Sequence, residues 1–297
     1  GAGDLMETLR AVRLTTEAAR RLRASRGTGR VHSAYARTLN VELDDLGNAG
    51  WVSLHGPGPI PSPFGIACES RPLTAGLEGA SVGVEGDTVV LDGRLRIVLD
   101  GAKVRDTGLP TLACLPSVSG CLRRAFAAVT AGLLPTAGAL LAGDVPPSDP
   151  LARTAAPALA RLYAATWARN EADCLAAARP LLGLGPGLTP AGDDCLVGWL
   201  AGAWTAGAAG RRLVEAMGPD LLAAATHLTS RLSTAFLAAA VNGEAAEPLH
   251  GFVLAPTEAR LAGLLALGAT SGADLLAGYL LARAALASGR EEGWPCR

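Results

Sequence analysis

The pattern of apolar and polar positions changes along the chain, from short punctuated runs to long helical periods. Residues 4–26 carry apolar side chains at helical spacing among Arg and Glu, which predicts an amphipathic first helix. The residues that follow form short apolar runs, and 31–40 and 51–54 are candidate strands. The early part of the chain is therefore expected to be rich in strands.

Turn residues punctuate this part of the chain. Asp92-Gly93 separates the apolar runs 88–91 and 94–99, which predicts a hairpin with a tight turn. Residues 56–63 contain four prolines and predict an extended loop. The Gly- and Pro-rich stretch 143–150 is the predicted domain boundary.

The second half of the chain is rich in Ala and Leu with helical periodicity, after a short helix near 122–134. The pattern predicts an α+β protein in which a β-rich domain over 1–145, an antiparallel barrel or sandwich, precedes an α-helical domain over 151–297. Helices are expected near residues 151–169, 171–182, 191–206, 218–240, 257–267 and 272–288.

Composition excludes several classes of protein. The chain has 297 residues, 49% hydrophobic and 18% charged, which is typical of a globular protein with a sizeable core. A net charge of −1 and 4% aromatic residues provide no basic face with stacking platforms, so we expect no nucleic-acid partner. The longest uncharged helical stretch, 195–210, is shorter than the roughly 20 residues that span a bilayer, so we expect no membrane segment.

The cysteines and the single lysine exclude several kinds of functional site. The six cysteines show no regular spacing, and with no secretory signal apparent they predict reduced thiols in a cytoplasmic protein. No Cys/His cluster has the spacing of a zinc site. Lys103 is the only lysine, so the chain lacks the lysine of a phosphate-binding loop. The Gly-x-Ser-x-Gly string at 79–83 leads into a hairpin, and we interpret it as a turn.

The run from Gly183 to Asp194 carries the strongest functional signal. Alternating glycines allow positive φ angles and the close approach of main-chain N–H groups to a ligand. Thr189 can cap the helix that follows and Pro190 can open it. The helix N-terminus favours anions, yet two aspartates occupy its first turn, so they can serve a ligand or a metal or simply complement the helix dipole. The predicted binding residues here are Gly185, Gly187, Leu188, Thr189 and Gly192, and the acids are Asp193 and Asp194.

An internal echo of this run appears about 80 residues later. The string Gly-x-Asp-x-Leu-x-Gly-aromatic-Leu occurs at 192–200 and again at 272–280, and the first copy has three extra residues near 186–188. Facing turns would pair Asp194 with Asp274 for acid/base chemistry, for binding N–H groups or for holding Mg²⁺. A chance match in an Ala/Gly/Leu-rich chain is the alternative. The second copy adds Thr270, Ser271 and Gly272 to the candidate site.

Residues 226–234 are unusually polar for a helix. The hydroxyl groups of this segment share one face, which suits small polar ligand groups, and Arg231 can act as a forked donor to a carboxylate or phosphate. Hydroxyls bonded back to carbonyls and a surface arginine are the alternative. Thr229, Arg231 and Ser233 are the candidate ligands, and His32 with Ser33 forms a weaker candidate near a Gly-Arg turn.

These motifs resemble a bacterial family, long catalogued as a domain of unknown function, that includes the H subunit of the oxamate carbamoyltransferase of allantoin catabolism. The resemblance rests on Val31-His32-Ser33, Asn40, the 58–61 region, the 183–194 signature, Thr229-x-x-Leu232-Ser233 and the 268–274 string. It implies handling of carbamoyl phosphate and a small amide or carboxylate such as oxamate or oxalurate, in purine catabolism. Other carbamoyltransferase subunits or a homo-oligomer are the implied protein partners.

Three functions are compatible with these residues. The first is a carbamoyltransferase or its ligand-binding subunit, in which main-chain amides and an arginine hold a small polar anionic metabolite. The second is a non-catalytic scaffold that binds the same metabolite. The third is a stand-alone ligase, lyase or hydrolase that acts on a ureido or amino acid. If the chain is an enzyme, Asp193, Asp194 and Asp274 are the candidate catalytic acids. Mg²⁺ is a candidate cofactor at Asp193 and Asp194.

Overall fold

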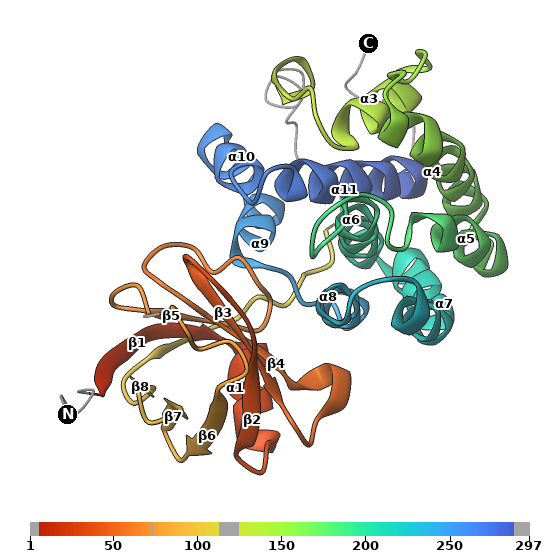
Figure 1. Cartoon of the computed structure of the whole chain (residues 1–297). Helices are drawn as coiled ribbons and strands as arrows, with labels where there is room; N and C mark the ends of the chain where they lie inside the picture. The colour runs from red at the N-terminus through yellow and green to blue at the C-terminus, as the bar shows by residue number, and fades with distance from the viewer. Residues whose placement is uncertain (1–5, 73, 113–124, 288–297) are drawn as a thin grey trace. The chain divides into compact units, whose positions relative to one another are not determined.

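The computed structural model of the protein describes residues 6–72, 74–112 and 125–287. The chain divides into two compact units, residues 1–107 and 108–297, and each is described by itself (Figure 1). The Gly- and Pro-rich stretch 143–150 lies inside the second unit, ahead of a long helix.

The first unit is an eight-stranded closed barrel with one additional strand. The strand order is β5-β4-β3-β2-β6-β7-β8-β1-β9, and pairing of β5 with β1 closes the ring. Most neighbours are antiparallel, but β1–β8, β1–β9 and β4–β5 are parallel. The strands are β1 (Glu7–Thr15), β2 (Thr28–Tyr35), β3 (Thr38–Leu43), β4 (Trp51–His55), β5 (Gly65–Cys68), β6 (Ser81–Glu85), β7 (Thr88–Leu91), β8 (Leu95–Val98) and β9 (Lys103–Arg105).

The predicted β-rich character is confirmed. The prediction of an amphipathic helix over residues 4–26 is wrong for the first part of that range. Residues 7–15 form β1, and the helix α1 (Thr16–Ala24) starts only after it. In β1, Leu9 and Ala11 are buried in the barrel core while Arg10 and Val12 are exposed. This strand uses both of its edges, pairing with β5 on one side and with β8 and β9 on the other. Pairing with distant strands therefore overrides the local helical pattern.

The predicted hairpin is confirmed as β7 and β8. Asp92 and Gly93 have φ angles of 51° and 66°, the left-handed values that a two-residue hairpin turn requires. Residues 56–63 form no strand, as their prolines predict. The Gly-x-Ser-x-Gly string, interpreted as a turn, is a turn only at Gly79, because Ser81 already lies in β6, where it is exposed.

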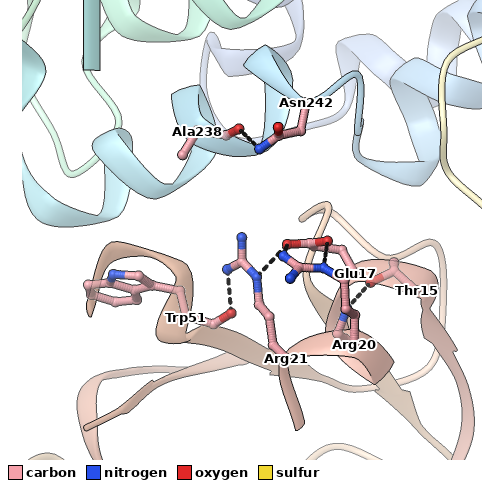
Figure 2. A network of polar contacts seen from close by, with 8 residues as sticks. Thr15, Glu17, Arg20, Arg21, Trp51, Ala238 and Asn242 are labelled. Atoms are coloured by element: carbon pink, nitrogen blue, oxygen red, sulfur yellow. Dashed lines mark hydrogen bonds and ion pairs between the residues drawn. The ribbon is translucent and has the colours of Figure 1, made fainter. Parts of the chain in front are cut away.

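Buried ionic and hydrogen-bonded contacts attach α1 to the barrel (Figure 2). Thr15 caps the helix by accepting the N–H of Ala18 at 3.1 Å. Arg21, which is 2% exposed, donates to the Trp51 carbonyl at 2.6 Å and to Glu17 at 2.8 Å. Burial would raise the pKa of Glu17, but hydrogen bonds and charge from Arg20 and Arg21 hold it below its usual value.

The second unit is helical and has its own apolar core. Its two central helices, α6 and α11, are buried along nearly their whole length. Other helices surround this pair in Figure 1. The helices are α3 (Leu134–Ala142), α4 (Pro150–Ala168), α5 (Glu171–Ala178), α6 (Ala191–Thr205), α7 (Ala208–Leu228), α8 (Arg231–Val241), α9 (Glu247–Leu254), α10 (Glu258–Leu265) and α11 (Ser271–Ala287).

The helix predicted over 218–240 is wrong, because two helices occupy this region. The first, α7, begins at Ala208 and ends at Leu228, and α8 begins at Arg231. The break forms because Thr229 is extended, with φ at −140°, and Ser230 caps α8 by accepting the N–H of Ser233 at 3.0 Å.

Other predicted helices in this half match closely, with a few differences. The helices predicted near 151–169, 191–206, 257–267 and 272–288 correspond to α4, α6, α10 and α11, while α5 ends early in a short 3-10 turn. Of the helix predicted near 122–134, residues 122–124 lie outside the described part, and only 125–128 are helical before α3. No helix of the described chain is long and apolar enough to cross a membrane.

Candidate functional site

The two central helices run side by side in the same direction and in register. A Cβ added to Gly198 of α6 would lie 1.9 Å from the Leu275 carbonyl oxygen, and one added to Gly278 of α11 would lie 1.8 Å from that of Cys195. One turn further on, Gly202 similarly abuts the Tyr279 carbonyl. Because only glycine allows backbones to approach this closely, these positions bring the two helix N-termini together.

The sequence echo is confirmed as a structural repeat. The N–H of Gly192 donates to the Leu184 carbonyl at 2.9 Å, and the N–H of Gly272 donates to the Leu267 carbonyl at 3.1 Å. Each glycine also lies against a preceding leucine carbonyl, with no room for a Cβ. The two copies therefore enter their helices through the same hydrogen-bonded turn. The three extra residues of the first copy form the exposed tip 186–188.

Asp194 and Asp274 occupy equivalent places in the two copies, in the first turns of α6 and α11. Both are buried, at 6% and 0% exposure, and the Oδ2 atom of each has no hydrogen-bond partner. The main-chain N–H of Leu133 donates to Oδ1 of Asp274 at 2.6 Å. The charge of Asp274 acts on Asp194, as expected if the two carboxyls are neighbours.

Burial perturbs both carboxyls toward their neutral forms. Desolvation raises the pKa of Asp194 to about 7, the hydroxyls of Ser271 and Thr189 oppose this shift, and the charge of Asp274 adds to it. Desolvation also raises the pKa of Asp274 to about 6, against hydrogen bonding from Leu133 and Thr270. Two carboxyls that titrate near neutral pH can exchange protons or accept hydrogen bonds at working pH.

Asp193 has a different environment from its neighbour. Its Oδ1 accepts the N–H of Gly183 at 2.9 Å, and its Oδ2 accepts the hydroxyl of Thr229. Burial raises the pKa of Asp193, and these hydrogen bonds, with one from Ser233, oppose the shift. Asp193 therefore connects the start of the signature loop to the α7–α8 junction.

The tip of the signature loop is attached to α8 through one carbonyl. The hydroxyls of Ser230 and Ser233 donate to the Leu188 carbonyl at 2.7 and 3.2 Å. Gly185 and Gly187 have φ angles of 110° and 102°, which confirms the positive φ expected of the alternating glycines. Arg231 opens α8 and is exposed.

Two details of this loop differ from expectation or were missed. Thr189 does not cap α6, because the helix begins one residue later with Pro190 at the N-cap and no side-chain cap. The hydroxyl of Thr189 is instead directed to Asp194. Sequence reasoning also missed Gly132 and Leu133, whose only signal is a glycine ahead of the α3 start. A Cβ on Gly132 would lie 2.5 Å from Oδ1 of Asp274, so glycine lets this segment approach the carboxyl.

His32 and Ser33 lie in strand β2 of the barrel unit. A bulge in β2 after Val31 places Ser33 opposite Asn40, and the Asn40 amide donates to Ser33 at 3.0 Å. The Ser53 hydroxyl donates to the side-chain oxygen Oδ1 of Asn40 at 2.8 Å. The His32 ring packs edge-on against Trp51 at 4.7 Å between centroids. These contacts form a separate polar cluster on β2, β3 and β4.

The described residues provide neither a metal cluster nor an activated thiol. In the described part of the chain, no group of three or more His, Cys, Asp or Glu side chains could hold a metal ion. Cys68, Cys174 and Cys195 are free and buried there, as predicted for reduced thiols. Burial raises the pKa of Cys195, and the charges of Asp274 and Asp194 add to the shift. Its thiol is therefore neutral at physiological pH and a weak nucleophile.

Comparison with known families gives two matches, one in each unit. The family model described as oxamate carbamoyltransferase subunit AllH matches residues 181–283, which include the whole structural repeat. The model of the AllH family N-terminal domain matches residues 10–104, which include nearly all of the barrel. No solved structure gives a significant match.

Proposed function

Because the chain belongs to the AllH family, whose name implies a subunit of oxamate carbamoyltransferase, we propose that it binds the small substrates of carbamoyl transfer at the paired N-termini of α6 and α11. The observation that carries this proposal is the pair of equivalent buried carboxyls, Asp194 and Asp274, each with an oxygen that lacks a partner. A buried polar atom without a partner costs about 1–3 kcal/mol, so its presence points to a ligand.

The surroundings of the pair suit a small polar substrate. Two parallel helices direct their main-chain N–H groups and the positive ends of their dipoles toward the same place, which favours a phosphate or carboxylate group. Gly185 and Gly187, both at positive φ, add main-chain N–H groups in the adjoining loop. Thr189, Thr270 and Ser271 are partly exposed and adjoin the carboxyls.

The hydrogen bonds of the signature loop separate the roles of the other candidate residues. We place Asp193, Thr229 and Ser233 in positioning roles, because their side chains form hydrogen bonds that fix the signature loop. Arg231 is the candidate donor to the anionic end of the substrate. Positioning and electrostatic stabilisation are sufficient for carbamoyl transfer to a weak nitrogen nucleophile, without a covalent intermediate.

Asp194→Asn tests the site in the protein itself. Titration calorimetry with carbamoyl phosphate and with oxamate should show binding by the natural chain, and the variant should bind at least about tenfold more weakly, the usual cost of one charged hydrogen bond. Asp220→Asn, a change of the same kind on the exposed face of α7, is the matched control and should bind normally. Unchanged binding by Asp194→Asn would remove this carboxyl from the site.

Activity assays separate the three functional alternatives. A carbamoyltransferase subunit should support carbamoyl transfer only when mixed with its partner subunits, and Asp194→Asn should abolish that activity. A scaffold should bind the metabolite, yet the complex should keep its activity when the carboxyl is changed. Turnover of a ureido or amino acid by the chain alone would instead indicate a stand-alone enzyme.

A further inference from the structure

We infer that the Oδ2 atoms of Asp194 and Asp274 together bind the NH₂ group of a primary amide or carbamoyl group, and that the site thereby distinguishes this group from a methyl or a carboxylate of the same size. This inference rests on the proposed function and deepens it, because it names the part of the substrate that the carboxyl pair recognises.

Helix packing places the two acceptors at the same end of the α6–α11 pair. The close contacts at Gly198 and Gly278 hold α6 and α11 in register, so equivalent first-turn residues lie at the same end of the helix pair. Oδ1 of Asp274 is already bonded to the Leu133 N–H. Both Oδ2 atoms are fully shielded from solvent without a protein partner. The arrangement thus leaves two buried acceptors, one from each copy of the repeat.

The chemistry of these acceptors selects their ligand. A carboxylate oxygen accepts hydrogen bonds, so its complement must donate. A phosphate or carboxylate at this position would be repelled, and a methyl group would leave both oxygens unpaired. None of the side chains that shift the pKa of either acid is a cation, so a salt bridge does not already occupy the pair. An amide NH₂ carries two N–H donors, one for each of the two oxygens.

The residues that adjoin the pair carry hydroxyl groups. Thr189 and Ser271 adjoin Asp194, Thr270 adjoins Asp274, and all three are partly exposed. The anionic end of the same ligand would then lie toward the main-chain N–H groups of the two helix starts. The carboxyls would therefore bind the N–H donors at one end of the ligand, and the helix N-termini would bind the negative charge at its other end.

Two isosteric ligand pairs test the inference. Pyruvate differs from oxamate, and acetyl phosphate from carbamoyl phosphate, by a methyl group in place of NH₂. By titration calorimetry, with the partner subunits present if the chain alone binds none of the four, we expect at least one amide to bind more than about 100-fold more tightly than its methyl analogue. The pair that shows the preference identifies whether oxamate or carbamoyl phosphate presents its NH₂ to the carboxyls.

Variants connect that preference to the carboxyls. Asp194→Asn and Asp274→Asn should each reduce the preference below about tenfold, and Asp220→Asn should retain it.

If Asp274→Asn does not fold, the comparison of Asp194→Asn with the natural chain still tests the inference. Equal binding of an amide and its methyl analogue, or a preference that survives both variants, would overturn the inference and leave the proposed function standing. Tighter binding of an amino acid than of either amide would also overturn it. Failure of all four ligands to bind chain and complex would reject the proposed function itself.

Discussion

The neighbouring residues Asp193 and Asp194 have different contacts, and the repeat explains the difference. Asp194 has an equivalent in the second copy, Asp274, whereas the position of Asp193 is taken there by Ala273. The repeated acid lies at the helix pair with a free oxygen, and the unrepeated acid holds the enlarged loop through Gly183 and Thr229. The sequence marked both as candidates, but only the hydrogen bonds separate them.

The buried carboxyl Asp194 should make stability depend on pH. Its pKa is about 7 in the folded chain against an ordinary value of 3.8, so between these values the folded state binds more protons than the unfolded state. The free energy of unfolding therefore falls as pH rises through this window and levels off above it. Asp194→Asn removes one such group, and at pH 8 it should be more stable than the natural chain by an amount on the order of 3 kcal/mol.

Thermal unfolding between pH 4 and pH 8 measures this effect. The curves of the natural chain and of Asp194→Asn should converge near pH 4 and diverge as pH rises. Asp274 titrates in the same window and remains in the variant, so some pH dependence should persist. Parallel curves would show that Asp194 is not perturbed in the folded protein.

Removal of the Thr229 hydroxyl should loosen the signature loop. Thr229→Val removes a hydrogen bond to the buried Asp193, which should lower the free energy of unfolding by about 1–3 kcal/mol. Urea denaturation measures the loss, and proteolysis at the exposed tip 186–188 should become faster. Thr226→Val changes an exposed threonine on α7 and should stay within about 0.5 kcal/mol. An equal effect of both substitutions would argue against a special role for Thr229.

Among the elements, α6 and α11 form the feature on which the site depends. Local sequence signals predicted where most helices begin and end, because caps and glycines act on adjacent backbone. These signals failed where contacts with distant segments determine the secondary structure. Residues 7–15 became a strand because they pair with distant strands, and residues 218–240 split because Ser230 both caps α8 and donates to Leu188.

Gly278→Ala should disrupt the helix pair. The added Cβ would meet the Cys195 carbonyl oxygen and the Trp199 nitrogen at 1.8 and 2.6 Å, so the helices must separate. We expect a loss of about 3 kcal/mol or more, beyond any gain in helix propensity. Gly263→Ala in α10 has nothing within 4 Å of its added Cβ and should instead gain up to about 1 kcal/mol. Chemical denaturation of both variants measures the contrast, and a stable Gly278→Ala chain would contradict the close packing.

At the scale of the whole molecule, two separate cores support the two units. Among the described residues, the buried members of one apolar cluster lie between Leu9 and Ile97, and those of the other lie between Leu109 and Ala282. The barrel closes through its own strands, with β5 paired to β1. Each unit therefore has what an independent fold requires.

The barrel unit should fold without the helical unit. A fragment of residues 1–107 is expected to show β-sheet circular dichroism and a cooperative thermal transition. It should bind neither carbamoyl phosphate nor oxamate, since the proposed site lies in the other unit. Absence of a cooperative transition would show that the barrel depends on the helical unit for stability.

Local sequence was sufficient for features whose physical cause lies within a few residues. The Asp92-Gly93 turn, the positive-φ glycines of the signature and most helix starts belong to this class, since φ preferences and caps act on adjacent backbone. Tertiary structure decided the strand identity of residues 7–15, the closure of the barrel and the environment of each aspartate. These depend on pairing and desolvation by segments far apart in the chain, as the contact of Leu133 with Asp274 shows. The echo in the sequence indicated two equivalent acids, and only packing of α6 against α11 made them a pair.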